Sequence, residues 1–317
     1  MAKQEITGKA FEYACLRALY DKYAPILDVR IKSDSNYQNA KKAYELLSLT
    51  EQNDYALAAK KGIEIISPLE PNLEYPDISE PLDLAIQPDK QGEKGDVRDV
   101  LCIRNEKGWN IGLSCKHDHE AVKHSRLSKT IDFGKDWLGV SVSEEYRKEI
   151  NPLFDDLEEL KKLKANWEDV EKKEERFYKT LLTAFLKEMR RIYEKEPKEV
   201  AENLLRYLLG RYDFYKIIAH TKDKTTEVKP FNIYGSLGLS TKDKKPQYKL
   251  TLLKLPTQIL SMDFKKDSMN TVLIHCDNGW ALSLRIHSAK KTVEPSLKFD
   301  IQLVGVPVNM GTRIEPW

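Results

Sequence analysis

Several features are missing from this sequence of 317 residues, and each absence excludes a class of protein. No apolar run approaches the roughly 18–20 residues that a membrane-spanning helix needs, and residues 1–5 lack the apolar core of a signal peptide. The P-loop pattern Gly-x-x-x-x-Gly-Lys-[Ser/Thr] is absent, so ATP-driven chemistry is not supported. The chain has neither a Gly-rich cofactor loop after an early strand nor a Pro-Cys dipeptide, which argues against a DNA methyltransferase.

Cysteine is also scarce. None of the cysteines forms a Cys-x-x-Cys pair, so neither a disulfide framework nor a zinc ribbon is predicted. We therefore expect a soluble protein of the reducing cytoplasm. The four cysteines are Cys15, Cys102, Cys115 and Cys276.

Charge is nearly balanced over the whole chain but is unevenly distributed along it. Charged residues make up 32% of the sequence, and the net charge is +2. Residues 216–254 nevertheless contain nine lysines and only three acidic residues, with aromatic residues between them. Such a stretch is typical of a surface that follows a phosphate backbone, but also of an ordinary solvated loop. The sequence alone leaves both interpretations open.

The apolar pattern predicts helices and strands in a mixed α/β order. Helices are expected at about 7–24 and 36–47, and a charged helical region at about 141–220. Residues 67–92 are rich in proline and are expected to be irregular. The predicted strands form two hairpins and one further strand: 97–104 with 109–116, 271–276 with 280–287, and 297–304.

The first predicted hairpin brings chemically useful side chains together. If Arg104 pairs with Trp109 across the turn, Asp99 lies opposite Ser114. Lys116 follows two residues later on the same face, so Asp99 and Lys116 reach a common point. One interpretation is a structural salt bridge. The other is a metal site, where a carboxylate holds a hard divalent cation and the lysine orients or deprotonates a water.

These residues resemble a nuclease motif. Asp99 followed by Ser114-Cys115-Lys116 on a hairpin is similar to the PD-(D/E)xK motif, with Ser114 where the second acid usually lies. The N-terminal helix and the surrounding sequence extend the likeness, so the chain resembles the HaeIII-type family of type II restriction endonucleases. The segments that carry this resemblance are 95–100, 112–128, 284–289 and 293–303.

The resemblance implies a fold and an activity. The expected fold is α/β, a restriction-endonuclease-like core with a mixed β-sheet flanked by helices and a helical insertion. We expect a catalytic core at 1–140, which contains the metal-site hairpin 97–116, followed by a helical insertion at 141–220. The C-terminal strands at 221–317 are expected to complete the core and contact DNA. The implied reaction is Mg²⁺-dependent cleavage of both strands of duplex DNA at a short palindrome, for which GGCC is suggested. A cognate DNA methyltransferase would act on the same site.

The serine at position 114 leaves the second metal-binding acid to be found elsewhere, because a hydroxyl is a poorer magnesium ligand than a carboxylate. Glu12 on the first helix is our first choice, and Asp96 is the second. The carbonyl of Cys115 would be a further ligand. In this hypothesis Asp99 and Glu12 hold Mg²⁺, and Lys116 orients the attacking water. Alternatively, Glu12 is an exposed helix carboxylate with no role in metal binding.

Basic residues in two regions are candidates for DNA contact. After the hairpin, His117 and its neighbours are expected to form a cationic rim, although Cys115 and the histidines also allow a zinc site and a plain surface turn. The alternating strand at 284–287 places two polar residues on one face, as a DNA-contacting strand or an ordinary half-buried strand would. The DNA-binding candidates are His119, Lys123, His124, Arg126, Arg285, His287 and Lys298.

Two other functions remain compatible with the sequence. One is a repair or structure-specific nuclease with the same core. The other is a non-catalytic DNA-binding protein whose Asp99–Lys116 pair is structural. A palindromic target is compatible with a homodimer and with a monomer that nicks each strand in turn.

Overall fold

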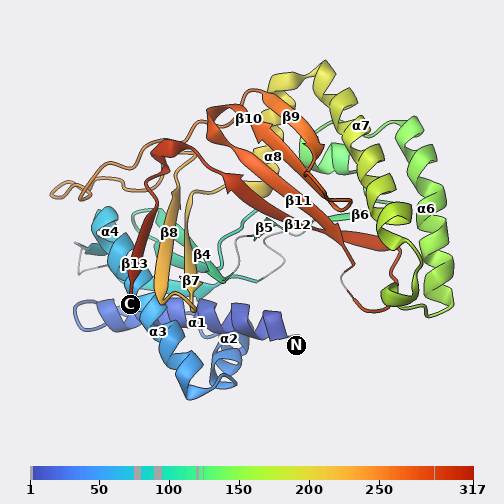
Figure 1. Cartoon of the computed structure of the whole chain (residues 1–317). Helices are drawn as coiled ribbons and strands as arrows, with labels where there is room; N and C mark the ends of the chain where they lie inside the picture. Colours follow the sequence, from blue (N-terminus) through green and yellow to red (C-terminus); the bar gives the residue numbers. More distant parts are fainter. Residues whose placement is uncertain (1–2, 75–79, 89–94, 119–120, 124, 289) are drawn as a thin grey trace. The chain divides into compact units, whose positions relative to one another are not determined.

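The computed structural model describes residues 3–74, 80–88, 95–118, 121–123, 125–288 and 290–317. The chain forms two compact units, and each is built from segments that are distant in the sequence (Figure 1). The first unit comprises Met1–Glu120, Arg211–Leu253 and Val308–Trp317. The second comprises Ala121–Gly210 and Lys254–Pro307.

The first unit contains a seven-stranded mixed sheet with the order β1-β2-β3-β4-β7-β8-β13. The pairs β1–β2 and β4–β7 are parallel, and the other neighbours are antiparallel. The hairpin β3–β4 therefore lies in the middle of the sheet. The strands are β1 (Val29–Ile31), β2 (Leu82–Ile86), β3 (Val100–Arg104), β4 (Trp109–His117), β7 (Phe214–His220), β8 (Thr225–Phe231) and β13 (Arg313–Pro316).

Helices α1 and α3 pack against this sheet (Figure 1). Local signals set where helices begin: Asp34 accepts the first backbone N–H groups of α2, and Ser48 and Glu51 form a capping box at α3. Gly62 of α3 leaves room for Ile217 of β7, because an added Cβ would lie 2.9 Å from it. The helices are α1 (Lys3–Tyr23), α2 (Ser35–Glu45), α3 (Leu49–Ile66), α4 (Pro71–Glu74) and the 3₁₀ helices η1 (Ser67–Leu69) and η6 (Val308–Met310).

The second unit contains an antiparallel six-stranded sheet. Its order is β5-β12-β11-β10-β9, and β6 also pairs with β12. The strands are β5 (Ala121–Lys123), β6 (Arg126–Ser128), β9 (Ile259–Phe264), β10 (Thr271–Cys276), β11 (Ala281–His287) and β12 (Ser296–Gly305).

Helices cover one face of the second sheet, and aromatic side chains fill the space between. Phe185 of α7 contacts Phe299 of β12 and Phe133, and Trp137 stacks on Tyr207 of α8. Each of these rings except Tyr207 is almost fully buried. The helices are α6 (Glu144–Lys162), α7 (Thr180–Lys195), α8 (Pro197–Leu209), the π-helices η2 (Gly134–Leu138) and η4 (Glu174–Lys179), and the 3₁₀ helices η3 (Trp167–Asp169) and η5 (Asp277–Gly279).

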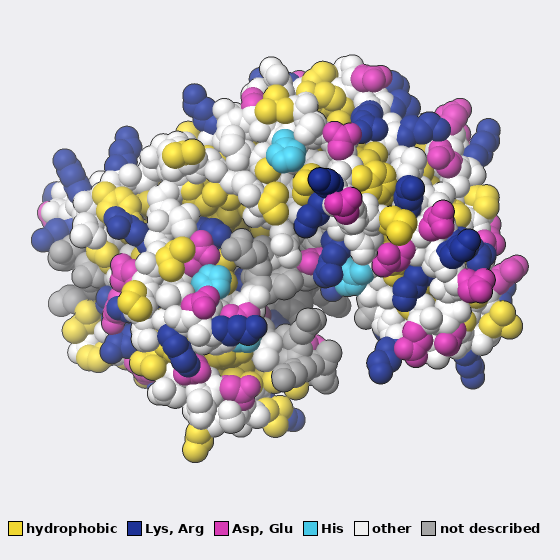
Figure 2. Space-filling model, viewed as in Figure 1, with side chains coloured by type: hydrophobic (Ala, Val, Ile, Leu, Met, Phe, Trp, Pro, Cys, Tyr) yellow, Lys and Arg dark blue, Asp and Glu magenta, His cyan; other side chains and the backbone are white. Residues whose placement is uncertain are grey.

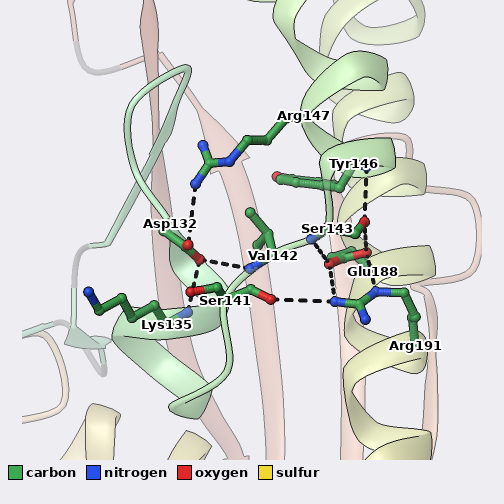
Figure 3. A network of polar contacts seen from close by, with 9 residues as sticks. All are labelled: Asp132, Lys135, Ser141, Val142, Ser143, Tyr146, Arg147, Glu188 and Arg191. Carbon is green, nitrogen blue, oxygen red and sulfur yellow. Dashed lines mark hydrogen bonds and ion pairs between the residues drawn. The ribbon is translucent and has the colours of Figure 1, made fainter.

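A polar network ties the start of α6 to α7 and to the preceding loop (Figure 3). Glu188 of α7 accepts hydrogen bonds from the backbone N–H and hydroxyl of Ser143, the N-cap of α6. Arg191 donates two hydrogen bonds to the same carboxylate. Asp132 accepts the N–H groups of Lys135 and Val142. Glu188 and Asp132 therefore hold the start of α6 against α7 and the preceding loop.

The structure confirms the predicted mixed α/β class and most of the predicted elements. Helix α1 and both predicted hairpins are present. The expectation of irregular structure throughout 67–92 was wrong, because β2 pairs with β1 and β3 there. Its alternating apolar residues, Leu82, Leu84 and Ile86, are buried in the sheet.

The two units also divide the chain differently from the predicted domains. Strand β7, expected inside a helical insertion at 141–220, pairs with β4 in the first sheet. Strands β9 to β12, expected to complete the core around the first hairpin, build the second sheet instead. Parallel pairing between strands about a hundred residues apart leaves no local mark in a sequence. In the described part of the chain, no helix is long and apolar enough to cross a membrane.

Candidate active site

The register of the β3–β4 hairpin determines where the candidate catalytic groups lie. Arg104 pairs with Trp109, as predicted, and Val100 pairs with Leu113. Asp99 directly precedes β3, and its backbone N–H donates to the carbonyl of Leu113 at 2.7 Å. The hairpin therefore continues beyond β3 for long enough to hold the Asp99 side chain beside β4.

Asp99 and Lys116 meet across this hairpin. The Nζ of Lys116 lies 3.1 Å from Oδ2 of Asp99, and the same oxygen accepts the N–H of Cys115 at 2.7 Å. Both side chains keep some exposure, 29% for Lys116 and 22% for Asp99. Burial disfavours the charged form of Lys116, but the charge of Asp99, the hydrogen bond to it and the charge of Glu12 together raise the pKa of Lys116. The pair is thus an accessible anion and cation with little freedom to separate.

Glu12 brings a second carboxylate to the same place from α1. Glu12 follows the buried Phe11 on the helix and is itself only 7% exposed. Burial and the negative charge of Asp99 raise the pKa of Glu12 to about 8, although Lys9 and Lys116 oppose this rise. Lys9, one turn earlier, lies 3.0 Å from the Glu12 carboxylate. Because the negative charge of Asp99 contributes to the raised pKa of Glu12, a cation bound beside both carboxylates would be stabilising.

The donor chemistry at this position fits a hard divalent cation. Asp99 and Glu12 offer carboxylate oxygens, and Mg²⁺ is commonly held by one or two carboxylates together with waters. Across the described ranges, no three His, Cys, Asp or Glu side chains are grouped so that they could hold a metal ion. Burial raises the pKa of the Cys115 thiol well above its usual value, which disfavours the thiolate form.

The structure does not bring Asp96 to this pair. Arg98 binds both oxygens of Asp96, with Nε at 2.7 Å from Oδ1 and Nη2 at 2.8 Å from Oδ2. Arg98 also donates to Asn110 of β4 at 2.6 Å. Asp96 thus anchors the chain just before β3.

Two lysines near the site were missed by sequence reasoning. Lys9 could have been found, because it precedes Glu12 by three residues and such helix neighbours face each other. Lys216 of β7 pairs in register with Ser114 and is 2% exposed. Only the parallel pairing of β4 with β7 reveals Lys216, and no local pattern in the sequence could have done so.

The DNA-binding candidates among the described residues fall into three groups. Arg126, Lys298 and His287 form one cross-strand row on β6, β12 and β11. Arg285 lies beside Asp300, with Nη2 at 3.3 Å from Oδ2. Lys123 donates to the carbonyl of Tyr207 at 3.0 Å, and burial lowers its pKa to about 8. The other two candidates, His119 and His124, lie outside the described residues.

His117 is held within the first unit. Its ring lies 4.9 Å from that of Tyr55 on α3, and its Nε2 lies 3.3 Å from both the Asp118 carboxylate and the Thr221 hydroxyl. Burial lowers the pKa of His117, which favours the neutral ring. The ring is therefore packed against α3, and its Nε2 is occupied by protein groups.

The lysine-rich stretch 216–254 contains both ion-paired and exposed lysines. Lys224 pairs with Asp54, and Lys229 pairs with Glu227. Lys242, Lys244 and Lys245 are exposed in the loop after β8. Elsewhere, Figure 2 shows that Lys and Arg alternate with Asp and Glu over α6 and α7, as the pair of Lys187 with Glu149 illustrates. Within 216–254, exposed lysines therefore lie both in the turn between β7 and β8, at Lys222 and Lys224, and along the loop after β8.

Comparison with known proteins identifies the class of enzyme that the fold and the cluster suggested. The family model described as "HaeIII restriction endonuclease" matches residues 8–307. The chain belongs to this family of restriction endonucleases, which confirms the resemblance. It is also 40% identical to "Type II restriction enzyme HaeIII" of Haemophilus aegyptius over 315 residues, covering 99% of this chain and 98% of that protein. No solved structure matches the chain. Type II restriction enzymes generally use a divalent metal ion and act on double-stranded DNA.

Proposed function

We propose that this chain hydrolyses both strands of duplex DNA at a short palindrome, in a reaction that requires Mg²⁺. The observation that carries the proposal is the cluster of Glu12, Asp99 and Lys116 in a member of the HaeIII restriction endonuclease family. GGCC, suggested by the family resemblance, is the proposed target. The products carry 5′-phosphate and 3′-hydroxyl ends.

Each residue of the cluster has a distinct proposed role. Asp99 and Glu12 hold the divalent cation, and the Cys115 carbonyl is a further ligand. When bound, the cation supplies Lewis-acid stabilisation of the phosphate and of the leaving oxygen. Lys116 orients the attacking water and neutralises charge that develops on the transferred phosphate. The Asp99 oxygen that accepts the Cys115 N–H keeps the Lys116 ammonium in position.

We also infer that the first unit is a restriction-endonuclease-like core. Its mixed sheet, with a central hairpin and a glutamate on the first helix, supports this inference. The proposed setting is the cytoplasm of a cell that holds a cognate DNA methyltransferase acting on the same site. Modification by that enzyme would protect the host DNA from cleavage.

A plasmid digest tests the proposal. A sequenced plasmid incubated with the protein and Mg²⁺ should yield discrete fragments whose ends map to one palindrome. Chelation of the metal should stop cleavage, and added Mg²⁺ should restore it. A smear would indicate a structure-specific nuclease. Binding without any Mg²⁺-dependent cleavage would indicate a non-catalytic DNA-binding protein.

A further inference from the structure

The sheet of the second unit has one apolar face and one polar face. Along β11, Leu282, Leu284 and Ile286 are fully buried, and they share the face of Phe299, which contacts Phe185 of α7. The alternate residues of β11 and β12 point to the opposite face. That face carries Ser283, Arg285, His287, Lys298, Asp300 and Gln302.

One row on this polar face concentrates positive charge. Lys298 pairs in register with Arg126 on one side and with His287 on the other. Burial and the charge of Arg126 lower the pKa of Lys298, so the two cations are close enough to repel each other. Arg126 is partly offset by Glu294 at 3.8 Å. A row of this kind suits a phosphate backbone, which would relieve the repulsion.

The neighbouring residues have a different arrangement, centred on a buried carboxylate. Asp300 is 5% exposed, and its Oδ2 accepts hydrogen bonds from Arg285 Nη2 and from Gln302 Nε2, both at 3.3 Å. An ionised carboxylate can only accept hydrogen bonds, so the NH₂ group of Gln302 must face Asp300. The Oε1 of Gln302 then remains as an acceptor for another group. The Arg285 side chain is 54% exposed and has further N–H donors.

The resulting pattern is a set of guanidinium donors beside an amide acceptor, both oriented by one oxygen. In the major groove, guanine presents the acceptors N7 and O6, and its partner cytosine presents the N4 donor. The pattern of Arg285 and Gln302 is complementary to that edge. An ordinary cross-strand ion pair would explain Arg285 with Asp300, but not the second donor on the same buried oxygen.

We propose that Arg285 and Gln302 read one G·C base pair in the major groove. This inference rests on the proposed cleavage of DNA. Arg285 donates to guanine, and Gln302 Oε1 accepts from cytosine N4. Asp300 is a positioning residue that orients both side chains. The row of Arg126, Lys298 and His287 contacts backbone phosphates beside them.

Equilibrium binding to short duplexes tests this inference. The full-length protein is titrated, without divalent metal, against duplexes that carry the palindrome mapped by the digest. In a matched set, each base pair of the palindrome is replaced symmetrically. For wild type, a substitution at each position that is read by a good side-chain contact should weaken binding affinity by about 5- to 150-fold relative to the mapped palindrome.

The variants should fall into two classes. Arg285→Met and Gln302→Met should lose discrimination at the same G·C position and keep it elsewhere, and Asp300→Asn should relax that position as well. Lys298→Met should instead weaken binding to every duplex and reduce the salt slope by about 1. Lys187→Met, on the helical side of the unit, is the control and should bind like wild type.

The outcomes separate this inference from the proposed function. If wild type cuts no duplex, the proposed function fails. If wild type cuts at a mapped site but Arg285→Met and Gln302→Met retain full discrimination, or lose it at different positions, only the base-reading inference fails. Gln302 is partly exposed, so its variant tests the inference even if Asp300→Asn unfolds. Thermal unfolding of every variant identifies such a case.

Discussion

Asp99 and Lys116 are joined across the β3–β4 hairpin by an ion pair of 3.1 Å that shares its carboxylate oxygen with the Cys115 N–H. The backbone donor limits how far the carboxylate can turn, so the ammonium is held on a defined side of it. This arrangement makes the pair one functional unit. Removal of either member should therefore have the effect of removing both.

The first prediction concerns catalysis by this pair. Asp99→Asn and Lys116→Met should each lower the single-turnover cleavage rate by about 100-fold or more. Asp99→Asn weakens the proposed cation site, and Lys116→Met removes the ammonium that neutralises charge at the transferred phosphate. The double variant should be no slower than the slower single variant, because the residues act together. Lys129→Met, which removes an exposed lysine paired with Asp155, is the control. A Lys116→Met rate near that of wild type, with normal DNA binding, would refute the assignment.

The second prediction concerns Glu12 and the metal requirement. Loss of an outer-shell partner costs about 10–100-fold in metal affinity, and a direct ligand should matter at least as much. Glu12→Gln should therefore shift the half-saturating Mg²⁺ concentration at least about tenfold upward. Calorimetric titration with Mg²⁺ in the absence of DNA measures the same change without relying on activity. An unchanged binding isotherm would remove Glu12 from the ligand set.

The third prediction concerns pH and stability. Glu70 is fully buried and accepts hydrogen bonds from the Tyr215 hydroxyl and the Gly238 N–H. Burial raises the pKa of Glu70 to about 7. Because this folded-state pKa exceeds the unfolded value of 4.5, the carboxyl contributes less stability as the pH rises through that interval. Above neutral pH, ionisation of the buried Glu70 should therefore destabilise the folded state.

The Glu70→Gln variant has no carboxyl that can ionise at this position, so its stability should not fall for this reason as the pH rises. Relative to wild type, its free energy of unfolding should improve by about 2 kcal/mol between pH 5.5 and pH 8. Urea unfolding at several pH values measures the difference. Glu106→Gln, at an exposed glutamate in the same unit, is the control. A constant difference for Glu70→Gln across this range would show that burial does not perturb this carboxyl.

The fourth prediction concerns the network in Figure 3. Glu188 is 3% exposed and binds Ser143 and Arg191. Glu188→Ala should lower the free energy of unfolding by about 3 kcal/mol, because it leaves the partly buried donors of Ser143 and Arg191 without their acceptor. Glu149→Ala removes only an exposed pair with Lys187 and should cost about 0–1 kcal/mol. Equal effects of the two variants would contradict the structural role of the network.

Local patterns in the sequence determined the parts of this protein that depend on short-range geometry. The turn after Arg104 and the alternation along both strands predict the hairpin, and the spacing of two then places Asp99 beside Lys116. The apolar stripe of the first helix likewise predicts that Glu12 lies next to a buried face. The family resemblance followed from the same residues.

The way in which these parts are assembled depends on contacts between segments that are distant in the chain. Parallel pairing of β4 with β7 brings Lys216 beside Ser114, and the separate sheet of the second unit brings Arg126, Lys298 and His287 into one row. Burial of Asp300 beneath Arg285 and Gln302 likewise depends on cross-strand register. Such contacts join residues far apart in the chain, and the free energy that selects them comes from packing whole faces together. A local pattern therefore cannot encode them.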